Sequence, residues 1–158
     1  MIDMLVRLYD LPDCGELYES LQREGVIIRR ARAFEKHQVA SWAVEHFSPK
    51  WGSECEVALS REPVSCFIAT RNKEIIGFVC YGATMKGFLG PMGVTEGARG
   101  LGLGKALLVR GLEAMYAEGY AYAVIGGVGP REFYEKAVGA IEIPGSDPGI
   151  YGDILPEK

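Results

Sequence analysis

Residues 94–108 read VTEGARGLGLGKALL, so three glycines stand at alternate positions directly before a leucine-rich helical pattern. Glycine is the poorest ordinary helix former, so local propensity does not explain Gly100, Gly102 and Gly104. A loop that leads from a strand into a helix can aim several free backbone N–H groups at one point, and glycine lets an anion approach that backbone closely. The stretch therefore predicts a phosphate-binding turn.

Two common phosphate-binding motifs do not fit this stretch. A P-loop requires GxxxxGK[ST], but an arginine stands five positions before Gly104, and Lys105 is followed by alanine. A dinucleotide-binding turn requires GxGxxG and an acidic residue about 20 positions later. Here the spacing is GxGxG, and the next expected strand, residues 120–126, has no carboxylate. The pattern R/Q-x-x-G-x-G/A fits at every fixed position from Arg99 to Gly104.

Composition limits the class of protein. The 158 residues are 48% hydrophobic and 24% charged, which is ordinary for one globular domain with a full core. A net charge of −4 gives no electrostatic case for a nucleic-acid partner. Four scattered cysteines and two histidines show no metal-ligand spacing, so no metal is expected. Early charges and the lack of an apolar run near ~20 residues predict a cytoplasmic protein that neither carries a signal peptide nor enters a membrane.

Hydrophobic periodicity places elements along the chain. Strands are expected at residues 4–9, 26–33, 65–70, 74–81, 87–94 and 120–126, the last one buried on both faces. Helices are expected at residues 34–47, 102–118 and 130–138, and capping-box patterns predict two more, from Asp13 to Gly25 and from Ser53 to about Ser60. Residues 140–143 and 150–155 are expected to form a closing hairpin. This order predicts an α/β fold, a single-domain, mixed, mostly antiparallel sheet of six or seven strands with flanking helices.

The glycine stretch resembles the acyl-CoA pyrophosphate loop of the GNAT superfamily of N-acetyltransferases. The resemblance continues downstream, where residues 133–140, FYEKAVGA, look like the family's L-Y-E-K-x-G-F stretch. Upstream, residues 74–78, EIIGF, resemble its third-strand opening, and the element order matches from about Val26 onward. The resemblance implies one acyl-CoA N-acyltransferase-like domain over residues 1–158, with residues 1–25 as an added N-terminal strand and helix.

The resemblance also implies where the cofactor lies. In GNAT enzymes acyl-CoA occupies a cleft between two parallel central strands that splay apart, here residues 87–94 and 120–126. By similarity the pantetheine arm of acetyl-CoA, the co-substrate, pairs with backbone near Met92, Gly93 and Val94. The pyrophosphate rests on the amides of Arg99, Gly100, Leu101, Gly102, Leu103, Gly104 and Lys105.

Two residues are expected to act in catalysis. The backbone N–H of Val94 or its neighbour polarises the thioester carbonyl, which helps most when that carbonyl becomes an oxyanion. Tyr134 stands where the family usually has its acid, and a phenol of pKa about 10 is protonated at pH 7. The sequence departs from the family pattern nearby, because Gly127 replaces an asparagine, Pro130 replaces an alanine, and one extra residue precedes Gly139.

The function implied is an N-acetyltransferase that moves an acetyl group from acetyl-CoA to a primary amine of a small molecule by direct attack in a ternary complex. Two alternatives stay open, a non-catalytic acyl-CoA-binding sensor or regulatory module and an unrelated protein whose glycine loop binds a nucleotide. A homodimer is common among resembling proteins. ATP binding without CoA binding would favour the nucleotide alternative.

The acceptor side of the site is less defined by the sequence. Glu54, Glu56 and Glu96 are carboxylates near the expected edges of the cleft, and a solvated surface position is the simpler interpretation of each. Four aromatic residues on the early helices either line an acceptor pocket or belong to the core. These are Trp42, His46, Phe47 and Trp51.

Overall fold

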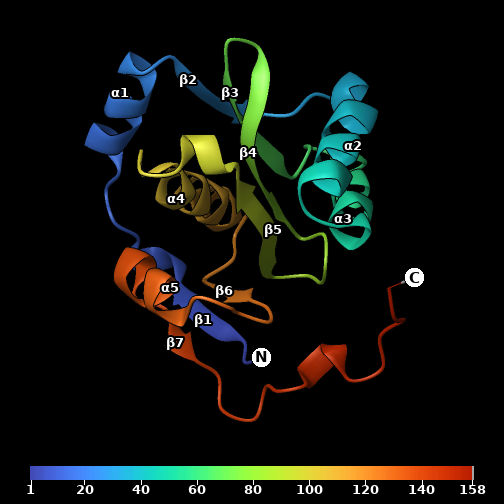
Figure 1. Ribbon diagram of the computed structural model, residues 1–158. Helices are drawn as coiled ribbons and strands as arrows, with labels where there is room; N and C mark the ends of the chain where they lie inside the picture. Colours follow the sequence, from blue (N-terminus) through green and yellow to red (C-terminus); the bar gives the residue numbers. More distant parts are fainter. Residues whose placement is uncertain (158) are drawn as a thin grey trace.

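Seven strands and five α-helices are arranged along residues 1–157, the part of the chain that the computed structural model describes (Figure 1). The strands are β1 (Met4–Arg7), β2 (Val26–Arg30), β3 (Cys66–Arg71), β4 (Glu74–Tyr81), β5 (Phe88–Val94), β6 (Tyr122–Ile125) and β7 (Ile141–Glu142). The helices are α1 (Gly15–Arg23), α2 (Lys36–His46), α3 (Pro49–Leu59), α4 (Leu103–Ala117) and α5 (Arg131–Val138). The strands form one sheet in the order β2-β3-β4-β5-β6-β1-β7, which confirms the predicted mixed, mostly antiparallel sheet.

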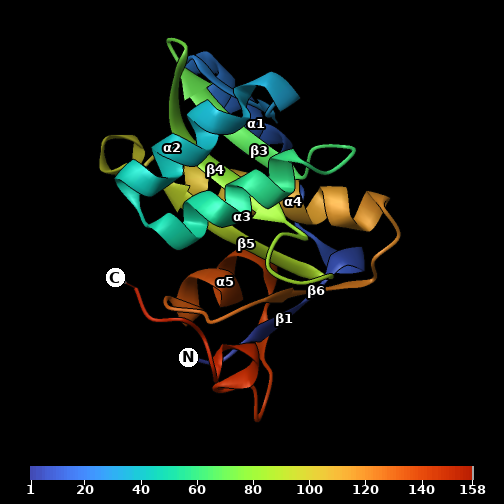
Figure 2. The same ribbon diagram turned by 90° about the vertical axis from the view of Figure 1, so that its right-hand side faces the viewer.

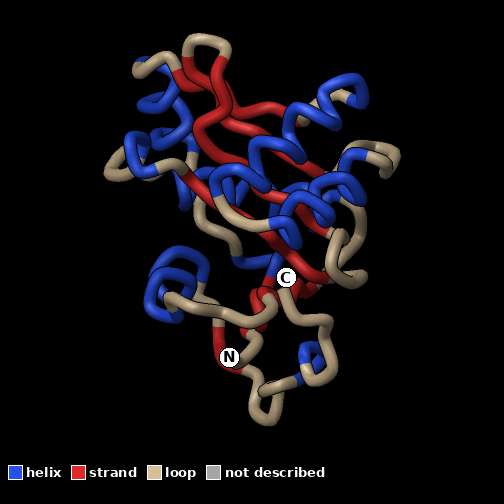
Figure 3. Tube along the Cα trace, turned by 45° about the vertical axis from the view of Figure 1, so that its right-hand side comes forward, coloured by secondary structure: helices blue, strands red, loops and turns tan. Residues whose placement is uncertain are grey.

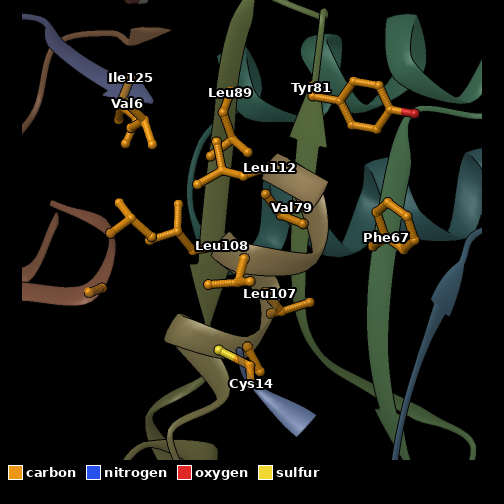
Figure 4. Close-up of a cluster of buried hydrophobic side chains, with 14 of the residues drawn as sticks. Val6, Cys14, Phe67, Val79, Tyr81, Leu89, Leu107, Leu108, Leu112 and Ile125 are labelled. Carbon is orange, nitrogen blue, oxygen red and sulfur yellow. The ribbon is translucent and has the colours of Figure 1, made fainter. Parts of the chain in front are cut away.

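Helices cover both faces of this sheet. α1 and α4 lie on one face, and α2 and α3 lie on the other, in front of β3 and β4 in Figure 2. Figure 4 shows Leu107 and Leu112 of α4 in one buried cluster with Val79 and Leu89 of the sheet, and Leu112 lies beside Leu89. All four side chains are buried. The helical stripe predicted for residues 102–118 is therefore the main core contact of this face.

Two glycines let α4 approach the sheet closely. A Cβ on Gly77 of β4 would lie 2.9 Å from Leu107 Cδ1, and a Cβ on Gly111 of α4 would lie 2.8 Å from Leu89 Cδ1. Both distances are shorter than an ordinary carbon–carbon contact, so a side chain at either position would push helix and sheet apart. Gly77 and Gly111 therefore serve the packing of the helix against the sheet.

The parallel pairing of β5 with β6 is brief. Phe88 faces Val124 and Leu89 faces Ile125, and the ladder ends there, although β5 continues to Val94. The parallel direction confirms the expectation that residues 87–94 and 120–126 form two parallel strands, and it is the direction of a strand that returns after a crossover helix. β6 is shorter than expected, and Tyr122 is 49% exposed, so the expectation of burial on both faces was wrong for this residue. The strands separate beyond Leu89 and leave a gap in the sheet.

The predicted closing hairpin was wrong. β7 pairs with β1 instead, with Met4 opposite Glu142 and Leu5 opposite Ile141. Residues 144–157 run as loop with one short 3₁₀ helix, Gly149–Tyr151 (Figure 3). β1 lies between β6 and β7 in the sheet. The backbone groups of β7 therefore pair with the outer edge of β1, whereas the sequence pattern assigned residues 150–155 as their partner.

The two predicted capping boxes were also wrong. α3 begins at Pro49, because Ser48 is the N-cap and its Oγ accepts a hydrogen bond from the Trp51 N–H at 3.2 Å. Ser53 lies inside this helix, where its Oγ donates to the Pro49 carbonyl. Asp13 accepts from the Gly15 N–H at 2.9 Å without a reciprocal bond. Proline is favoured at the first helical position because its φ is preset and its missing N–H is not needed there.

Candidate active site

A cavity of about 1120 Å³ opens where β5 and β6 separate. α3 and Phe47 form one side, β5 forms the base, and the loop after β6, α5 and part of the C-terminal segment form the other side. Five of the predicted site residues line it, namely Met92, Gly93, Val94, Arg99 and Tyr134. The other six belong to the loop and helix start that continue from Arg99 and do not line it, namely Gly100, Leu101, Gly102, Leu103, Gly104 and Lys105.

The backbone of β5 presents N–H groups to this gap. The Thr95 N–H donates to the Ile76 carbonyl of β4 at 2.9 Å. Successive N–H groups along a strand point to opposite sides, so the N–H groups of Val94 and Met92 point away from β4. β6 no longer pairs with β5 at this level. These two donors therefore face the cavity, as the resemblance implies for Val94 or its neighbour.

The glycine loop has a backbone that only glycine adopts easily. Gly100 has φ +89° and Gly102 has φ +78°, both in the left-handed region. Gly102 is the N-cap of α4, and no side chain caps the helix. The first intrahelical bond runs from the Ala106 N–H to the Gly102 carbonyl. The three preceding amides thus have no partner inside the helix, which makes this end able to receive an anion.

Gly104 differs from the other two glycines of the loop. Its φ is not in the left-handed region, and a Cβ there would meet only the Phe133 ring, at 3.7 Å. That is an ordinary contact, so neither backbone strain nor internal packing requires glycine at this position. At Gly102, in contrast, a Cβ would also lie 2.8 Å from Leu17 Cδ1. Gly104 is therefore the position at which a substitution tests ligand approach rather than folding.

Tyr134 lies on α5 with its side chain half-buried against the cavity. Burial raises the pKa of its phenol above the ordinary 10.0, so the hydroxyl is protonated at neutral pH. The extra residue before Gly139 is accommodated at the end of the helix. Gly139 has φ +66° and its N–H donates to the Glu135 carbonyl, while the Ala140 N–H donates to the Tyr134 carbonyl. The turn carrying Tyr134 stays regular.

The family assignment follows from comparison with known proteins. Residues 16–140 match the family model described as the acetyltransferase (GNAT) family, which is most of the chain. The chain belongs to the GNAT family. No curated protein matches this GNAT chain. Among residues 1–157, none of the helices combines the length and apolar character needed to span a bilayer.

Solved structures share the fold of this GNAT chain at low sequence identity. A glucosamine N-acetyltransferase region of a fungal multi-domain enzyme superposes with a TM-score of 0.73 at 14% identity, over 90% of this chain and 19% of that one. A GCN5-related N-acetyltransferase from Sphaerobacter thermophilus gives 0.67 at 21% identity, over 90% and 48%. A ribosomal-protein-alanine N-acetyltransferase from Brucella melitensis gives 0.54 at 17%, over 84% and 99%. The chain therefore spans about a fifth and about half of the first two structures.

A residue that the sequence analysis missed fills the place beside Gly127 in this GNAT domain. The Tyr151 ring lies 3.5 Å from the position that a Cβ on Gly127 would take. The Tyr151 hydroxyl lies against the position that a Cβ on Gly126 would take. The Gly127 N–H is held by Asp3, whose Oδ1 accepts it at 2.8 Å. A side chain at Gly127 would therefore begin in ordinary contact with the Tyr151 ring, in space that the bare glycine leaves to this ring. No sequence signal pointed to Tyr151, because residues 150–155 were expected to be a strand.

Two of the four aromatic candidates line the cavity. Phe47 and Trp51 do so, with ring centroids 4.8 Å apart. Trp42 and His46 stack on each other at 4.6 Å behind them, outside the lining. The Phe47 ring covers Gly93 so closely that a Cβ there would lie 2.8 Å from Phe47 Cε1. Because Gly93 has no side chain, the Phe47 ring can lie directly against β5, the strand whose N–H groups are the predicted donors.

We expect Gly93→Ala to lower stability and to disturb this wall. The added methyl group overlaps the Phe47 ring, and overpacking of this kind costs about 1–3 kcal/mol. Thermal unfolding monitored by tryptophan fluorescence reports both effects, because Trp51 packs on Phe47. A variant with unchanged Tm and an unchanged fluorescence spectrum would contradict the close fit.

The three candidate carboxylates differ in their positions. Glu54 of α3 lines the cavity and is half-buried, whereas Glu56 and Glu96 are exposed and lie outside its lining. Burial raises the pKa of Glu54, and a hydrogen bond from the Thr84 hydroxyl opposes part of this effect. The structure therefore distinguishes Glu54, which lines the cavity, from Glu56 and Glu96, which do not. The sequence alone did not distinguish them.

Proposed function

We propose that this GNAT domain transfers an acetyl group from acetyl-CoA to a primary amine of a small molecule, by direct attack in a ternary complex. The observation that carries the proposal is the gap between β5 and β6. On its two sides, outward N–H groups of β5 and the Tyr134 phenol line one cavity. The family supports acetyl transfer, while the acetyl group, the amine and its small size belong to the proposal.

Each part of acetyl-CoA has proposed partners. The pantetheine arm lies along Met92, Gly93 and Val94, whose outward backbone groups have no strand partner in the gap. The pyrophosphate lies on the amides from Arg99 to Lys105. The left-handed glycines and the uncapped start of α4 support this placement, because free amides and the helix dipole favour negative charge there.

The proposed chemistry needs a donor for the carbonyl and a proton for the leaving group. The N–H of Val94, or that of Met92 on the same side of β5, polarises the thioester carbonyl. Tyr134 gives its proton to the departing thiolate, and its half-buried position keeps that proton in place at neutral pH. Neither step uses a metal or a covalent bond to the protein.

Calorimetric titration with acetyl-CoA, with ATP as the comparison ligand, tests the proposal. We expect acetyl-CoA to bind with a Kd in the micromolar range and ATP to give no heat of binding. Thiol release in the presence of primary amines then measures transfer. Failure to bind acetyl-CoA would overturn the function and leave only the fold, while ATP binding alone would favour a nucleotide site.

Three broader expectations remain predictions from the sequence. They are a cytoplasmic location, a homodimer, and the status of residues 1–25 as an addition to the family domain. The family-model match begins at residue 16, and β1 lies inside the sheet between β6 and β7. Deleting residues 1–8, which include β1, tests the expectation about residues 1–25. If these residues are an independent addition, the shortened protein still folds and binds acetyl-CoA.

A further inference from the structure

Glu54 is a half-buried carboxylate without a cationic partner. The ion pairs among residues 1–157 join the Met1 amino group to Asp147, Arg29 to Glu35, and Arg131 to Glu142. Glu54 accepts one hydrogen bond, from the Thr84 hydroxyl in the loop before β5. A carboxylate that loses part of its hydration without gaining a cation is costly to the fold. Its place at the cavity suggests that the compensating charge comes from a ligand.

The groups around Glu54 leave room for that charge. Lys50 stands one helical turn earlier on α3 and also lines the cavity, yet it forms no ion pair with Glu54. Cys55 is the neighbouring buried thiol. Tyr151 of the C-terminal segment lines the same cavity, where burial first, and then the charges of Asp3 and Glu54, raise the pKa of its phenol. Glu54 thus accepts a hydrogen bond from one alcohol and lines the open cavity, whose charged lining also includes Lys50, Arg99 and Asp147, the last paired with the Met1 amino group.

The same side of the cavity offers an apolar surface. Trp51 lies three residues before Glu54 on α3, so the two side chains share a face of the helix. Trp51 stacks on Phe47, which covers Gly93 of β5. Aromatic faces attract cations and pack well against flat or apolar groups. A ligand seated here places a cationic end at Glu54 and an apolar body on the two rings.

We propose that Glu54 binds the ammonium group of the acceptor and removes its proton, and that the acceptor is a cationic primary amine with an apolar or aromatic body. This inference rests on the proposed function. An ammonium ion is not a nucleophile, so it has to lose a proton before it attacks. Thr84 holds the carboxylate in place for that step.

Every proton and electron pair of the proposed acetyl transfer has a destination. Glu54 takes one proton from the ammonium group, and the freed nitrogen lone pair forms the C–N bond to the thioester carbonyl carbon. The C–S bond then breaks, its electron pair leaves with sulfur, and Tyr134 protonates that thiolate. The second amine proton returns to the Tyr134 oxygen through solvent, and Glu54 releases its proton to solvent. The products are the N-substituted acetamide, free thiol and one proton.

Glu54→Gln tests the assignment, with 2-phenylethylamine as the acceptor probe. Glutamine keeps the size of the side chain and an oxygen that accepts from Thr84, but it neither carries charge nor takes a proton. We expect the Kd for acetyl-CoA to stay within about twofold and kcat/KM for the amine to fall by about 100-fold or more at pH 7. Glu56→Gln, two residues along the same helix on the exposed side, is the matched control and keeps full activity.

The pH profile and the substrate test the two halves of the inference separately. In the unmodified protein we expect kcat/KM to rise with pH along a limb whose pKa lies above the ordinary 4.5 of glutamate, because burial disfavours the charged carboxylate. Glu54→Gln removes that limb. Equal kcat/KM in the Glu54→Gln and Glu56→Gln variants would overturn the role of Glu54. No turnover of 2-phenylethylamine by protein that binds acetyl-CoA would overturn the acceptor class, whereas absent acetyl-CoA binding would overturn the proposed function beneath it.

Discussion

Tyr134→Phe is expected to lower kcat by about 100-fold or more while leaving the Kd for acetyl-CoA within about twofold, as for loss of a general acid. The phenylalanine ring keeps the packing of α5, including the edge contact with Phe133 at 5.0 Å. Among residues 1–157, no hydrogen bond to the Tyr134 hydroxyl is lost. Thiol-release kinetics give kcat, and calorimetry gives the affinity. The variant therefore separates chemistry from binding and from folding.

The pH dependence of the same variant identifies the group. Burial raises the pKa of Tyr134 above 10.0, and the protonated phenol is the active form, so the unmodified protein loses kcat only above about pH 10. Tyr134→Phe has no such limb. Unchanged kcat and an unchanged alkaline limb would remove Tyr134 from the reaction. Tight acetyl-CoA binding by the unmodified protein without thiol release for any primary amine in a panel, rather than for 2-phenylethylamine alone, would favour the non-catalytic sensor.

Gly104→Val is expected to raise the Kd for acetyl-CoA at least tenfold, which is about 1.4 kcal/mol of binding free energy. The valine side chain occupies the space in front of the free amides of α4, where the pyrophosphate is proposed to lie. Because Gly104 has no left-handed φ and an added Cβ meets only Phe133 at 3.7 Å, the fold tolerates the change. We expect Tm to shift by no more than about 2–4 °C, which is the effect of ~1 kcal/mol.

Two further variants of α4 complete this test. Gly104→Ala keeps most of the affinity, because the R/Q-x-x-G-x-G/A pattern accepts alanine at this position. Gly111→Ala places a Cβ 2.8 Å from Leu89 Cδ1, so it lowers stability by about 1–3 kcal/mol and leaves the affinity of the folded protein unchanged. If Gly104→Val lost stability and affinity in the same proportion as Gly111→Ala, the glycine would serve packing rather than ligand approach.

Local patterns predicted most of the elements. Residues 65–70 and 74–81 were predicted as neighbouring strands, and the structure joins β3 to β4 by a hairpin in which Asn72 and Lys73 adopt φ values of 53° and 65°. The helices predicted at residues 102–118 and 130–138 are present as α4 and α5, since a helix depends on neighbours within a few turns of chain. The family resemblance likewise came from short stretches, namely residues 99–104, 133–140 and 74–78, together with the order of the elements, and the family-model match confirms it.

Long-range pairing decided what local patterns did not. The partner of β7 is β1, some 140 positions away in sequence, and the competing hairpin had equally plausible residues. Tyr151 reaches Gly126 and Gly127 only because that pairing sends the C-terminal segment back across the cavity. No periodicity encodes which edge a short strand joins, since the free energy comes from contacts between distant segments.

The sequence by itself predicted the family, which the family-model match confirms, and it proposed residues 99–105 as an anion-binding turn and Tyr134 as the acid, because these predictions depend on residue types at fixed spacing. Only the tertiary structure decided which side chains share the cavity. It turns the N–H groups of Met92 and Val94 into the gap and sets Trp51 beside Phe47. It also selects Glu54 over the two other carboxylates, because its place in the cavity wall and its hydrogen bond from Thr84 depend on α3 and the loop before β5, which meet only in the folded chain.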